Sequence, residues 1–289
     1  MPDDLTTMAR DIRRLAIAAI HAAGSGHPGG ALSAADILAF LYGRELGLTA
    51  QNIADSRRNR FVLSKGHACP ALYAAAGLCG LVPLAQTVRL RKLGSIMQGH
   101  PHVVDAPWTE TSTGSLGQGF SVAIGMALGL RHQQAQARVY ALLGDGELQE
   151  GEVWEAAMCA AHYGLSNLCA IVDYNKMQSD DLNANIMGLE PLGDKWAAFG
   201  WRVEEIDGHD FAAIADAFAA ARGEPARPSV IIAHTIKGKG VSYMENVPAW
   251  HGSVALRDEE TQQALADLGV PADEVAAWLA GEGTAGRAA

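Results

Sequence analysis

The chain of 289 residues has few cysteines, few charges and no long hydrophobic run, and each scarcity excludes a class of protein. Its four cysteines form no Cys-x-x-Cys pair, which argues against a zinc site or a secreted disulfide framework and favours free thiols. The amino terminus lacks the basic and then apolar layout of a signal peptide. No apolar run approaches the ~20 residues that span a bilayer. We therefore expect a cytoplasmic protein without a membrane partner.

Basic residues are also scarce, since 22 Lys and Arg face 32 Asp and Glu and the formal net charge is −10. Nucleic-acid phosphates would repel such a chain, so we expect no nucleic-acid partner. The sequence has no Gly-x-Gly-x-x-Gly loop between an early strand and a helix, and no Gly-Lys-Ser/Thr phosphate loop, which disfavours a nucleotide-binding domain. Hydrophobic residues make up 49%, enough for a large globular core.

Short apolar runs alternate with helical patterns along the chain. Helices are predicted at about 5–23, from Ser33 through Tyr42 behind a capping box Ser33–Asp36, from about Pro70, and at 118–133, 151–163 and 211–222. Strands are predicted at 61–63, 138–143, 167–173, 202–206 and 228–234. This order predicts an α/β fold with a mostly parallel sheet and helices on both faces. We expect one domain over 1–289, with a functional loop at 176–195 and a frayed tail after about Gly281.

The most informative feature lies at the ends of two of these strands. Asp145 stands between Gly144 and Gly146 after one apolar run, and Asn175 follows the next run thirty residues later. Ligands bind beyond the carboxyl ends of parallel strands. Glycines let the backbone approach phosphate oxygens, and Asp and Asn oxygens suit Mg²⁺ or Ca²⁺. A helix starting near Glu150 adds its positive end. The pattern predicts a cation held against a diphosphate.

Four of the ten histidines share settings rich in glycine. They are His27 in Ser-Gly-His-Pro-Gly-Gly, His67 in Ser-Lys-Gly-His, His100 in Gln-Gly-His-Pro and His251 in Trp-His-Gly. Neutral histidines hydrogen-bond hydroxyls and move protons near neutral pH. We expect these four to lie in one site, and we assign the other six no role.

These strings carry a resemblance to a known family. Gly-Asp-Gly, about thirty residues and then Asn resembles the metal motif of thiamine-diphosphate enzymes, and Asp173-Tyr-Asn-Lys-Met177 resembles its transketolase variant. The four histidine strings, in this order around the motif, resemble the amino-terminal region of transketolase from about residue 9 to 256. The resemblance therefore implies the thiamine-diphosphate-binding fold of the diphosphate type.

The resemblance also implies roles for individual residues. His27 and His100 would face the substrate, while His67 and His251 would contact the cofactor diphosphate. The loop Thr113–Gly119 resembles the loop that reaches the middle of the cofactor, with Gly114, Ser115 and Leu116 at the contact.

Further implied roles concern the metal and the acids. Asp145, Asn175 and the Met177 carbonyl would bind the metal, with Gly144 and Gly146 beside the diphosphate. Glu150 and Glu155 match carboxylates near a dimer interface, and Lys237 matches a lysine that some transketolases place near the cofactor. For both glutamates an ordinary place in the first turns of a helix stays open. For Lys237 a solvated loop position stays open.

In this family a glutamate of a separate pyrimidine-binding domain activates the cofactor. No further run of strands and helices follows Trp250–Gly252 to supply that domain. We therefore expect a split transketolase, whose second chain carries the pyrimidine-binding and carboxy-terminal domains in an α₂β₂ assembly. Its expected reaction moves a two-carbon ketol unit from a ketose phosphate to an aldose phosphate.

Other interpretations stay open. One is a specialised transketolase or a deoxyxylulose-phosphate-synthase-like enzyme, although the Ser-Gly-His-Pro-Gly string favours transketolase. Another is a regulatory paralogue without activity, which we disfavour because every inspected position holds a chemically competent residue. Some transketolases carry a basic residue where this chain has Ser253, so local contacts there are expected to differ.

Overall fold

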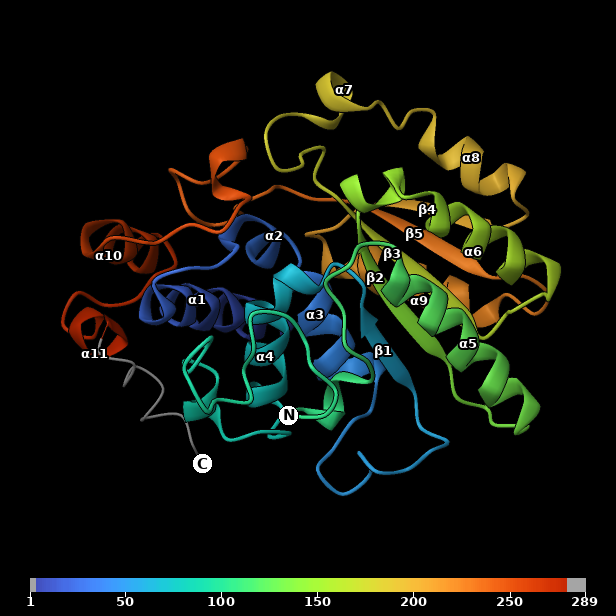
Figure 1. The fold of residues 1–289 in the computed structure, drawn as a ribbon, viewed down its shortest axis with the longest axis horizontal. Coiled ribbons are helices and arrows are strands. Elements are labelled where there is room, and N and C mark those ends of the chain that lie inside the picture. Colours follow the sequence, from blue (N-terminus) through green and yellow to red (C-terminus); the bar gives the residue numbers. More distant parts are fainter. Residues whose placement is uncertain (1–3, 280–289) are drawn as a thin grey trace.

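The computed structural model of the chain describes residues 4–279, and their centre is a five-stranded parallel sheet (Figure 1). The strands lie in the order β1-β2-β3-β5-β4, and each neighbouring pair is parallel. Their bounds are β1 (Arg60–Leu63), β2 (Val139–Gly144), β3 (Leu168–Tyr174), β4 (Arg202–Asp207) and β5 (Ser229–His234). After β3 the chain skips one place to form β4 at the edge of the sheet, and β5 then fills the gap between β3 and β4. Because all strands are parallel, their carboxyl ends lie at the same edge of the sheet.

Helices cover both faces of this sheet. On one side lie α1 (Leu5–Ala23), α3 (Ala35–Phe40), α4 (Cys69–Leu78) and α9 (Phe211–Gly223). On the other side lie α5 (Gln118–His132), α6 (Gly151–His162) and α8 (Leu192–Ala198). The remaining α-helices of residues 4–279 are α2 (Pro28–Ser33), α7 (Asn183–Ile186), α10 (Asp258–Asp267) and α11 (Val275–Leu279). There are also a π-helical turn (Leu41–Glu45) and 3₁₀ turns at Gly66–Ala68, Leu84–Gln86, Pro107–Thr109, Gly146–Gln149 and Pro248–Trp250. The predicted fold class is confirmed.

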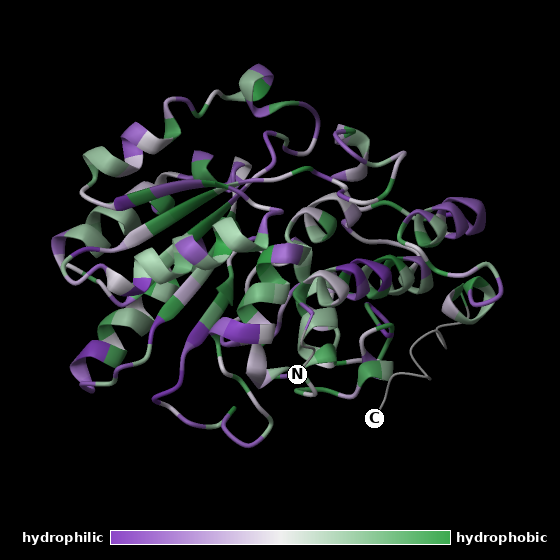
Figure 2. Cartoon of the chain, turned by 180° about the vertical axis from the view of Figure 1, so that it is seen from behind, coloured by the Kyte–Doolittle hydropathy of each residue, from purple (hydrophilic) through white to green (hydrophobic). Residues whose placement is uncertain are grey.

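The core consists of two hydrophobic clusters separated by the sheet. Along β3, Cys169 and Ile171 belong to one cluster and Ala170 and Val172 to the other, since successive side chains of a strand point to opposite faces. β3 is buried along its whole length, which explains its continuous apolar run. In Figure 2 the central strands are mostly coloured hydrophobic. The sheet edge that carries the site is thus held rigidly from both sides.

The predicted helix boundaries hold at α1 but fail at Ser33. α1 begins after Asp4, whose side chain accepts from Thr6 N–H, and ends at Gly24 with φ 69°. Ser33 was expected to cap a helix through Tyr42, and this is wrong: Ser33 ends α2, and α3 starts without a side-chain cap. The Ser33 hydroxyl instead donates to the Gly30 carbonyl and to the buried Asp173 carboxylate.

Two further expectations concern the loop and the tail. The segment at 176–195 was expected to be a loop; it contains α7 and the first turn of α8. The expected fraying after about Gly281 falls outside the described residues. Across residues 4–279 no helix combines the length and hydrophobicity that crossing a membrane requires.

Candidate active site

The predicted pair of oxygen ligands lies where β2 and β3 end side by side. Gly144 is in register with Asp173, so Asp145 and Asn175 leave neighbouring strands at the same edge. Both side chains are buried. The Asp145 carboxylate accepts from Gly146 N–H at 2.8 Å and from Lys176 N–H, and the Asn175 amide oxygen accepts from Met177 N–H at 3.1 Å. The two loops are therefore joined through these side chains.

The electrostatic state of Asp145 favours a neighbouring cation. Burial, together with the nearby Asp173 carboxylate, raises the pKa of Asp145 to about 6. The Lys237 ammonium and the two backbone N–H donors act in the opposite direction. A carboxylate so poorly solvated gains from a positive partner.

The available donors are all oxygens, as a hard divalent cation requires. They are the Asp145 carboxylate, the Asn175 amide and the Met177 carbonyl, and this mixed set of side-chain and main-chain oxygens is typical of Mg²⁺ and Ca²⁺ ligands. Residues 4–279 contain no group of three or more His, Cys, Asp or Glu arranged for a metal. A site here would thus use one carboxylate with neutral oxygens, a set that leaves room for diphosphate oxygens as further ligands.

A cavity of about 220 Å³ opens beside these groups. Its walls come from loops at the carboxyl edge of the sheet. Most of the residues singled out from the sequence line it, namely His67, Leu116, Gly144, Asp145, Gly146, Glu150, Asn175, Met177, Lys237 and His251. The other lining residues are Gly30, Lys65, Glu147, Gln149, Gln178 and Ser179. Segments up to 221 positions apart in the sequence (30 to 251) thus share one cavity.

The four selected histidines gather in one cluster. The ring centroids of His27 and His67 lie 5.3 Å apart, and those of His67 and His251 also lie 5.3 Å apart. His27 lies 6.4 Å from His100 and 6.5 Å from His251 by the same measure. His67 and His251 line the cavity, whereas His100 lines a neighbouring hollow. The structure thus brings together all four side chains.

Burial keeps these histidines neutral. It lowers the pKa of His27 to about 4, with the Arg91 and Lys237 cations acting in the same direction. It lowers the pKa of His251 to about 3, with the Lys237 cation again acting in the same direction. The pKa values of His67 and His100 are lowered as well, again chiefly by burial. Near pH 7 the cluster therefore offers neutral rings, each with one donor and one acceptor nitrogen.

Lys237 fixes the tautomer of His251. This lysine is buried, and its ammonium donates to the Met177 carbonyl at 3.0 Å and contacts Nδ1 of His251. Burial lowers its pKa to about 8, with Asp145 opposing, so the amine stays mostly protonated at pH 7. An ammonium has no acceptor, so Nδ1 of His251 must accept and Nε2 must carry the proton. His251 therefore presents an N–H donor from Nε2.

The loop before α5 requires a glycine at position 114. Its φ is 139°, and a Cβ there would lie 2.8 Å from Cδ2 of His100. Leu116 of the same loop lines the cavity, while Ser115 is exposed. The hydroxyl of Thr113 and Nδ1 of His27 are buried without a hydrogen-bond partner among residues 4–279. A polar ligand bound beside these two groups would supply the hydrogen bonds that they lack.

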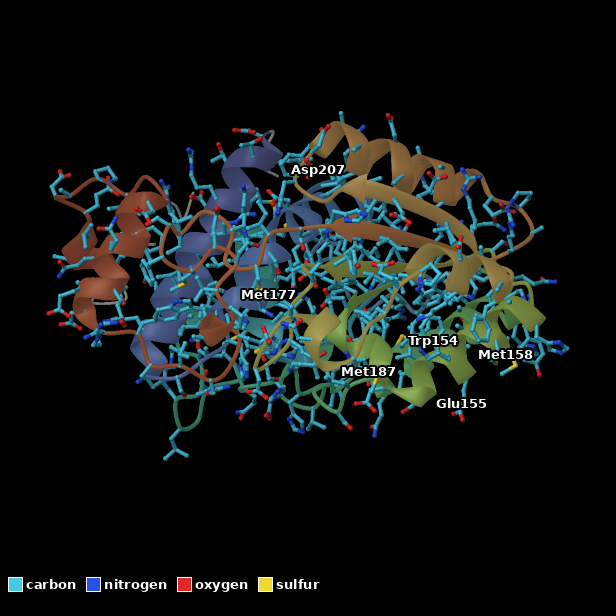
Figure 3. All side chains as sticks on the ribbon, turned by 90° about the horizontal axis from the view of Figure 1, so that it is seen from above. Trp154, Glu155, Met158, Met177, Met187 and Asp207 are labelled. Atoms are coloured by element: carbon cyan, nitrogen blue, oxygen red, sulfur yellow. The ribbon has the colours of Figure 1, made fainter. Side chains whose placement is uncertain are left out.

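The two glutamates of α6 take different positions. Glu150 is the residue before α6 and lines the cavity. Glu155 lies one turn further on and is exposed; Figure 3 shows it, with Met158, on the outer side of the helix. Glu155 does not line the cavity, so cofactor contact within this chain has no support, and its role at a dimer interface stays a prediction.

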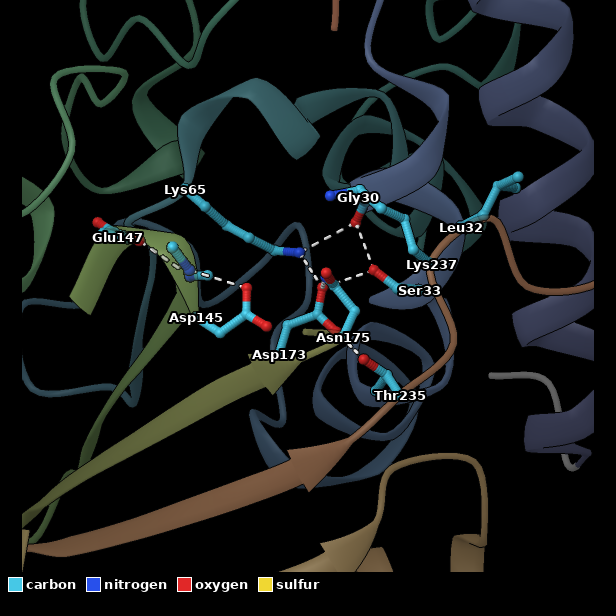
Figure 4. Close-up of polar contacts among 12 residues, drawn as sticks. Gly30, Leu32, Ser33, Lys65, Asp145, Glu147, Asp173, Asn175, Thr235 and Lys237 are labelled. Atoms are coloured by element: carbon cyan, nitrogen blue, oxygen red, sulfur yellow. Dashed lines mark hydrogen bonds and ion pairs between the residues drawn. The ribbon is translucent and has the colours of Figure 1, made fainter. Parts of the chain in front are cut away.

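Sequence reasoning missed a buried ionic network beneath the site (Figure 4). The Asp173 carboxylate pairs with the Lys65 ammonium and accepts from Ser33, Thr235 and the Asn175 amide. Lys65 also donates to the Gly30 carbonyl at 3.0 Å. The amide N–H₂ of Asn175 donates to Asp173, so the amide oxygen points away from Asp173. The string Asp173-Tyr-Asn175 was visible in the sequence, but its partners were not.

Glu147 is a second residue that the sequence reasoning passed over. One of its oxygens accepts from the Ser64 hydroxyl and from Gly117 N–H at 2.9 Å, and the other accepts from Gly144 N–H at 3.0 Å. Burial raises its pKa, and these donors oppose the rise. Glu147 thus ties three loops around the cavity, and its place in Gly-Asp-Gly-Glu is the signal that could have found it.

Comparison with known proteins agrees with this geometry. Residues 5–277 match the family described as transketolase, thiamine diphosphate binding domain. The chain is 43% identical to the 6-deoxy-6-sulfo-D-fructose transketolase subunit SqwG of Clostridium sp. (strain MSTE9), over 92% of this chain and 96% of that one. It is 38% identical to an apulose-4-phosphate transketolase subunit of Phocaeicola vulgatus, over 89% and 90% respectively.

Solved structures give the same result. The transketolase of Leishmania mexicana superposes with a TM-score of 0.88 at 28% identity, over 98% of this chain and 48% of that one. The chain therefore spans about half the length of this solved transketolase. The family resemblance drawn from the sequence is confirmed. The chain belongs to the transketolase family, whose thiamine-diphosphate-binding, amino-terminal domain it forms.

Proposed function

We propose that the chain is the cofactor-binding subunit of a two-chain transketolase. Its reaction transfers a two-carbon ketol (glycolaldehyde) unit from a ketose phosphate to an aldose phosphate. The observation that carries this proposal is that the oxygen donors of Asp145, Asn175 and Met177 share one cavity with His67 and His251. The substrate-facing candidates His27 and His100 adjoin that cavity.

The proposed cofactor set is thiamine diphosphate with Mg²⁺ or Ca²⁺. When bound, thiamine diphosphate supplies the nucleophilic carbon that such a transfer needs. Asp145, Asn175 and the Met177 carbonyl would hold the cation, and the cavity walls at Gly144 and Gly146 would face the diphosphate. The oxygen-only donor set supports this assignment.

The other site residues act by binding and by proton placement. His251, with its Nε2 proton fixed by Lys237, would donate to the cofactor diphosphate, and His67 lies beside it and would do the same. His27 and His100 are neutral and so can accept from sugar hydroxyls as well as donate to them. Gly114, Ser115 and Leu116 would meet the middle of the cofactor. Glu150 and Glu155 would lie near a dimer interface and would pair or pass protons between sites there.

The second chain is part of the proposal. It would carry the pyrimidine-binding and carboxy-terminal domains, with residues 1–289 as one diphosphate-binding domain and an α₂β₂ assembly overall. Both relatives are named as subunits, and each is matched over at least 90% of its length, which supports a separate partner. The four free thiols support a reducing cytoplasm.

Co-expression tests the proposed function. The chain would be produced with the product of the adjacent reading frame and assayed for ketol transfer with thiamine diphosphate and Mg²⁺. We expect activity from the pair and none from the chain alone. Robust turnover by the pure chain would refute the need for a partner, and an inactive pair across all tested ketose and aldose phosphates would favour a regulatory paralogue.

A specialised donor sugar is a second candidate within the same chemistry. The two relatives are named for 6-deoxy-6-sulfo-D-fructose and for apulose 4-phosphate, and both resemble this chain over most of their length. A panel that includes a sulfonated ketose, a branched ketose phosphate and common ketose phosphates would separate the candidates by kcat/KM.

A further inference from the structure

Arg91 contacts three of the four segments that carry site histidines, and its side chain donates to two of them. Its Nη1 donates to the Ser25 hydroxyl at 2.8 Å and to the Ser253 hydroxyl at 3.0 Å. Ser25 lies two residues before His27, and Ser253 lies two residues after His251. One guanidinium nitrogen therefore joins the turn of His27 to the loop of His251. Ser253 is also the position where this chain departs from the basic residue of some transketolases.

The same two loops are paired through their backbones. Gly26 N–H donates to the Val254 carbonyl at 3.0 Å, and Val254 N–H donates to the Gly26 carbonyl at 2.8 Å. A Cβ at Gly26 would lie 2.6 Å from Ile20, so α1 presses on this bridge from behind. The contacts of Arg91 thus reinforce a junction that the backbone has already fixed in register.

The third loop packs directly on the Arg91 side chain. A Cβ at Gly99 would lie 2.8 Å from Nε of Arg91, so only the glycine before His100 leaves room for the guanidinium. Arg91 N–H donates to the Met97 carbonyl at 2.8 Å and closes this loop on itself. One half-buried side chain therefore touches the segments of His27, His100 and His251.

The backbone at Arg91 is strained in a way that its local sequence does not require. Its φ is 56°, in the left-handed region that residues with a side chain rarely occupy. Such a conformation persists where the surroundings impose it. Here the guanidinium of the same residue donates to the two serines.

The charge of Arg91 is not neutralised by an ion pair within residues 4–279, where each of the salt bridges involves other residues. After burial, it is the largest influence that lowers the pKa of His27 and of His100. His27 also faces His67, His100, His251 and Lys237, all of them neutral rings or cations.

We propose that Arg91 is a positioning residue for His27, His100 and His251, whose segments it holds in one arrangement through Ser25, Gly99 and Ser253. This inference deepens the proposed function and rests on it. Arg91 does not line the cofactor cavity, and of the three histidines whose segments it contacts only His251 does, so its loss should lower substrate binding and transfer more than cofactor binding.

The test compares four variants in the assembled complex. Arg91→Met removes the charge and the donors but keeps the stem, and Arg91→Lys keeps the charge with a single donor centre. Ser25→Ala with Ser253→Ala removes the acceptors alone. Arg89→Met is the matched control. Arg89 lies two residues before Arg91, is exposed, and makes no side-chain hydrogen bond or ion pair with residues 4–279.

We expect Arg91→Met to lower kcat/KM by about 30- to 100-fold, as small displacements of binding groups do. The serine double variant should also lower kcat/KM. Arg91→Lys should lose less of kcat/KM than Arg91→Met does, and Arg89→Met should have the wild-type value. Thiamine-diphosphate affinity, measured by calorimetry, should fall much less than kcat/KM does. Loss of the Arg91 cation raises the pKa of His27 and of His100. The acid limb of the pH profile of kcat/KM should therefore move toward neutral pH in Arg91→Met, and it should keep its wild-type position in Arg91→Lys.

Histidine NMR of the chain, with no substrate present, separates this inference from the proposed function. The titration midpoints of His27 and His100 should rise in Arg91→Met and not in Arg89→Met. Unchanged midpoints and kcat/KM would overturn the inference, as would a loss of rate explained fully by lost cofactor binding. If Arg91→Met does not fold, the serine double variant decides: wild-type kcat/KM in it would overturn the inference. An inactive wild-type pair would instead refute the proposed function alone.

Discussion

At the scale of single residues, the site depends on groups kept neutral or charged by their surroundings. Asp145 and Asn175 were found from the sequence because each follows an apolar run. Asp145 also lies between two glycines, and Asn175 follows it at a spacing of thirty residues. Lys65, Asp173 and Glu147 were not found. Each is an ordinary residue in its own string and gains meaning only from partners up to 140 positions away, such as Ser33 for Asp173.

His27 leads to a prediction for stability against pH. Its pKa is about 4 in the folded chain, well below its ordinary value of 6.5, chiefly through burial. Between these values the unfolded chain binds a proton that the folded chain does not, so stability is lost as pH falls from about 6.5 toward 4. We expect the melting temperature to fall across this window, and less steeply in His27→Gln.

Thermal melts between pH 7.5 and 4.5 measure this effect. His132→Gln, which removes an exposed histidine at the end of α5, is the control and should leave the slope as in the wild type. An identical slope in His27→Gln and wild type would show that the ring is not buried as a neutral group.

At the scale of helices and strands, the sheet was predictable and its connections less so. Continuous apolar runs revealed β2, β3 and β5, since a strand covered on both faces has no polar side, whereas the edge strand β4 carries Arg and Glu and is only partly buried. The capping box at Ser33 failed because the hydroxyl meets a buried carboxylate at the end of β3, a tertiary contact that outweighs the local capping preference. No local pattern around Ser33 contains that information.

The Lys65–Asp173 pair joins the end of β1 to the end of β3 and gives a prediction at this scale. Both side chains are fully or almost fully buried. Lys65→Met leaves the Asp173 carboxylate without its cation, which typically costs about 3–5 kcal/mol. Asp173→Asn added to Lys65→Met removes that stranded charge, so the double variant should be more stable than Lys65→Met alone.

Urea unfolding of both single variants and the double variant measures the coupling. Arg257→Met is the control, because it removes the cation of a surface ion pair, Arg257–Glu260. It should change the free energy of unfolding little. Strictly additive losses in the double variant would mean that the two buried charges do not stabilise one another.

At the scale of the whole molecule, α5 and α6 present apolar side chains to solvent. Met158 is 56% exposed and Val122 40% exposed, and Glu155 lies on the outer side of α6 near Met158 (Figure 3). In the proposed α₂β₂ assembly this face would meet a second copy of the chain. The sequence indicated the carboxylates of α6, but only the fold shows that α5 and α6 form one surface.

Met158→Lys should therefore weaken assembly and leave the fold intact. We expect native mass measurements of the complex with its partner chain to shift from α₂β₂ toward αβ, with the circular dichroism spectrum unchanged. Leu93→Lys alters a fully exposed apolar side chain elsewhere and serves as the control. A complex of wild-type mass in Met158→Lys would place the contact on another face.

The most direct measurement for the whole account is calorimetric titration of the assembled complex with thiamine diphosphate and Mg²⁺. Asp145→Ala should weaken binding by about 2 kcal/mol or more, roughly 30-fold, because it removes the anionic ligand of the proposed cation. Asp180→Ala, which removes an exposed acid on the neighbouring loop, should bind as the wild type does. Equal affinity in Asp145→Ala and wild type would contradict the assignment of the site.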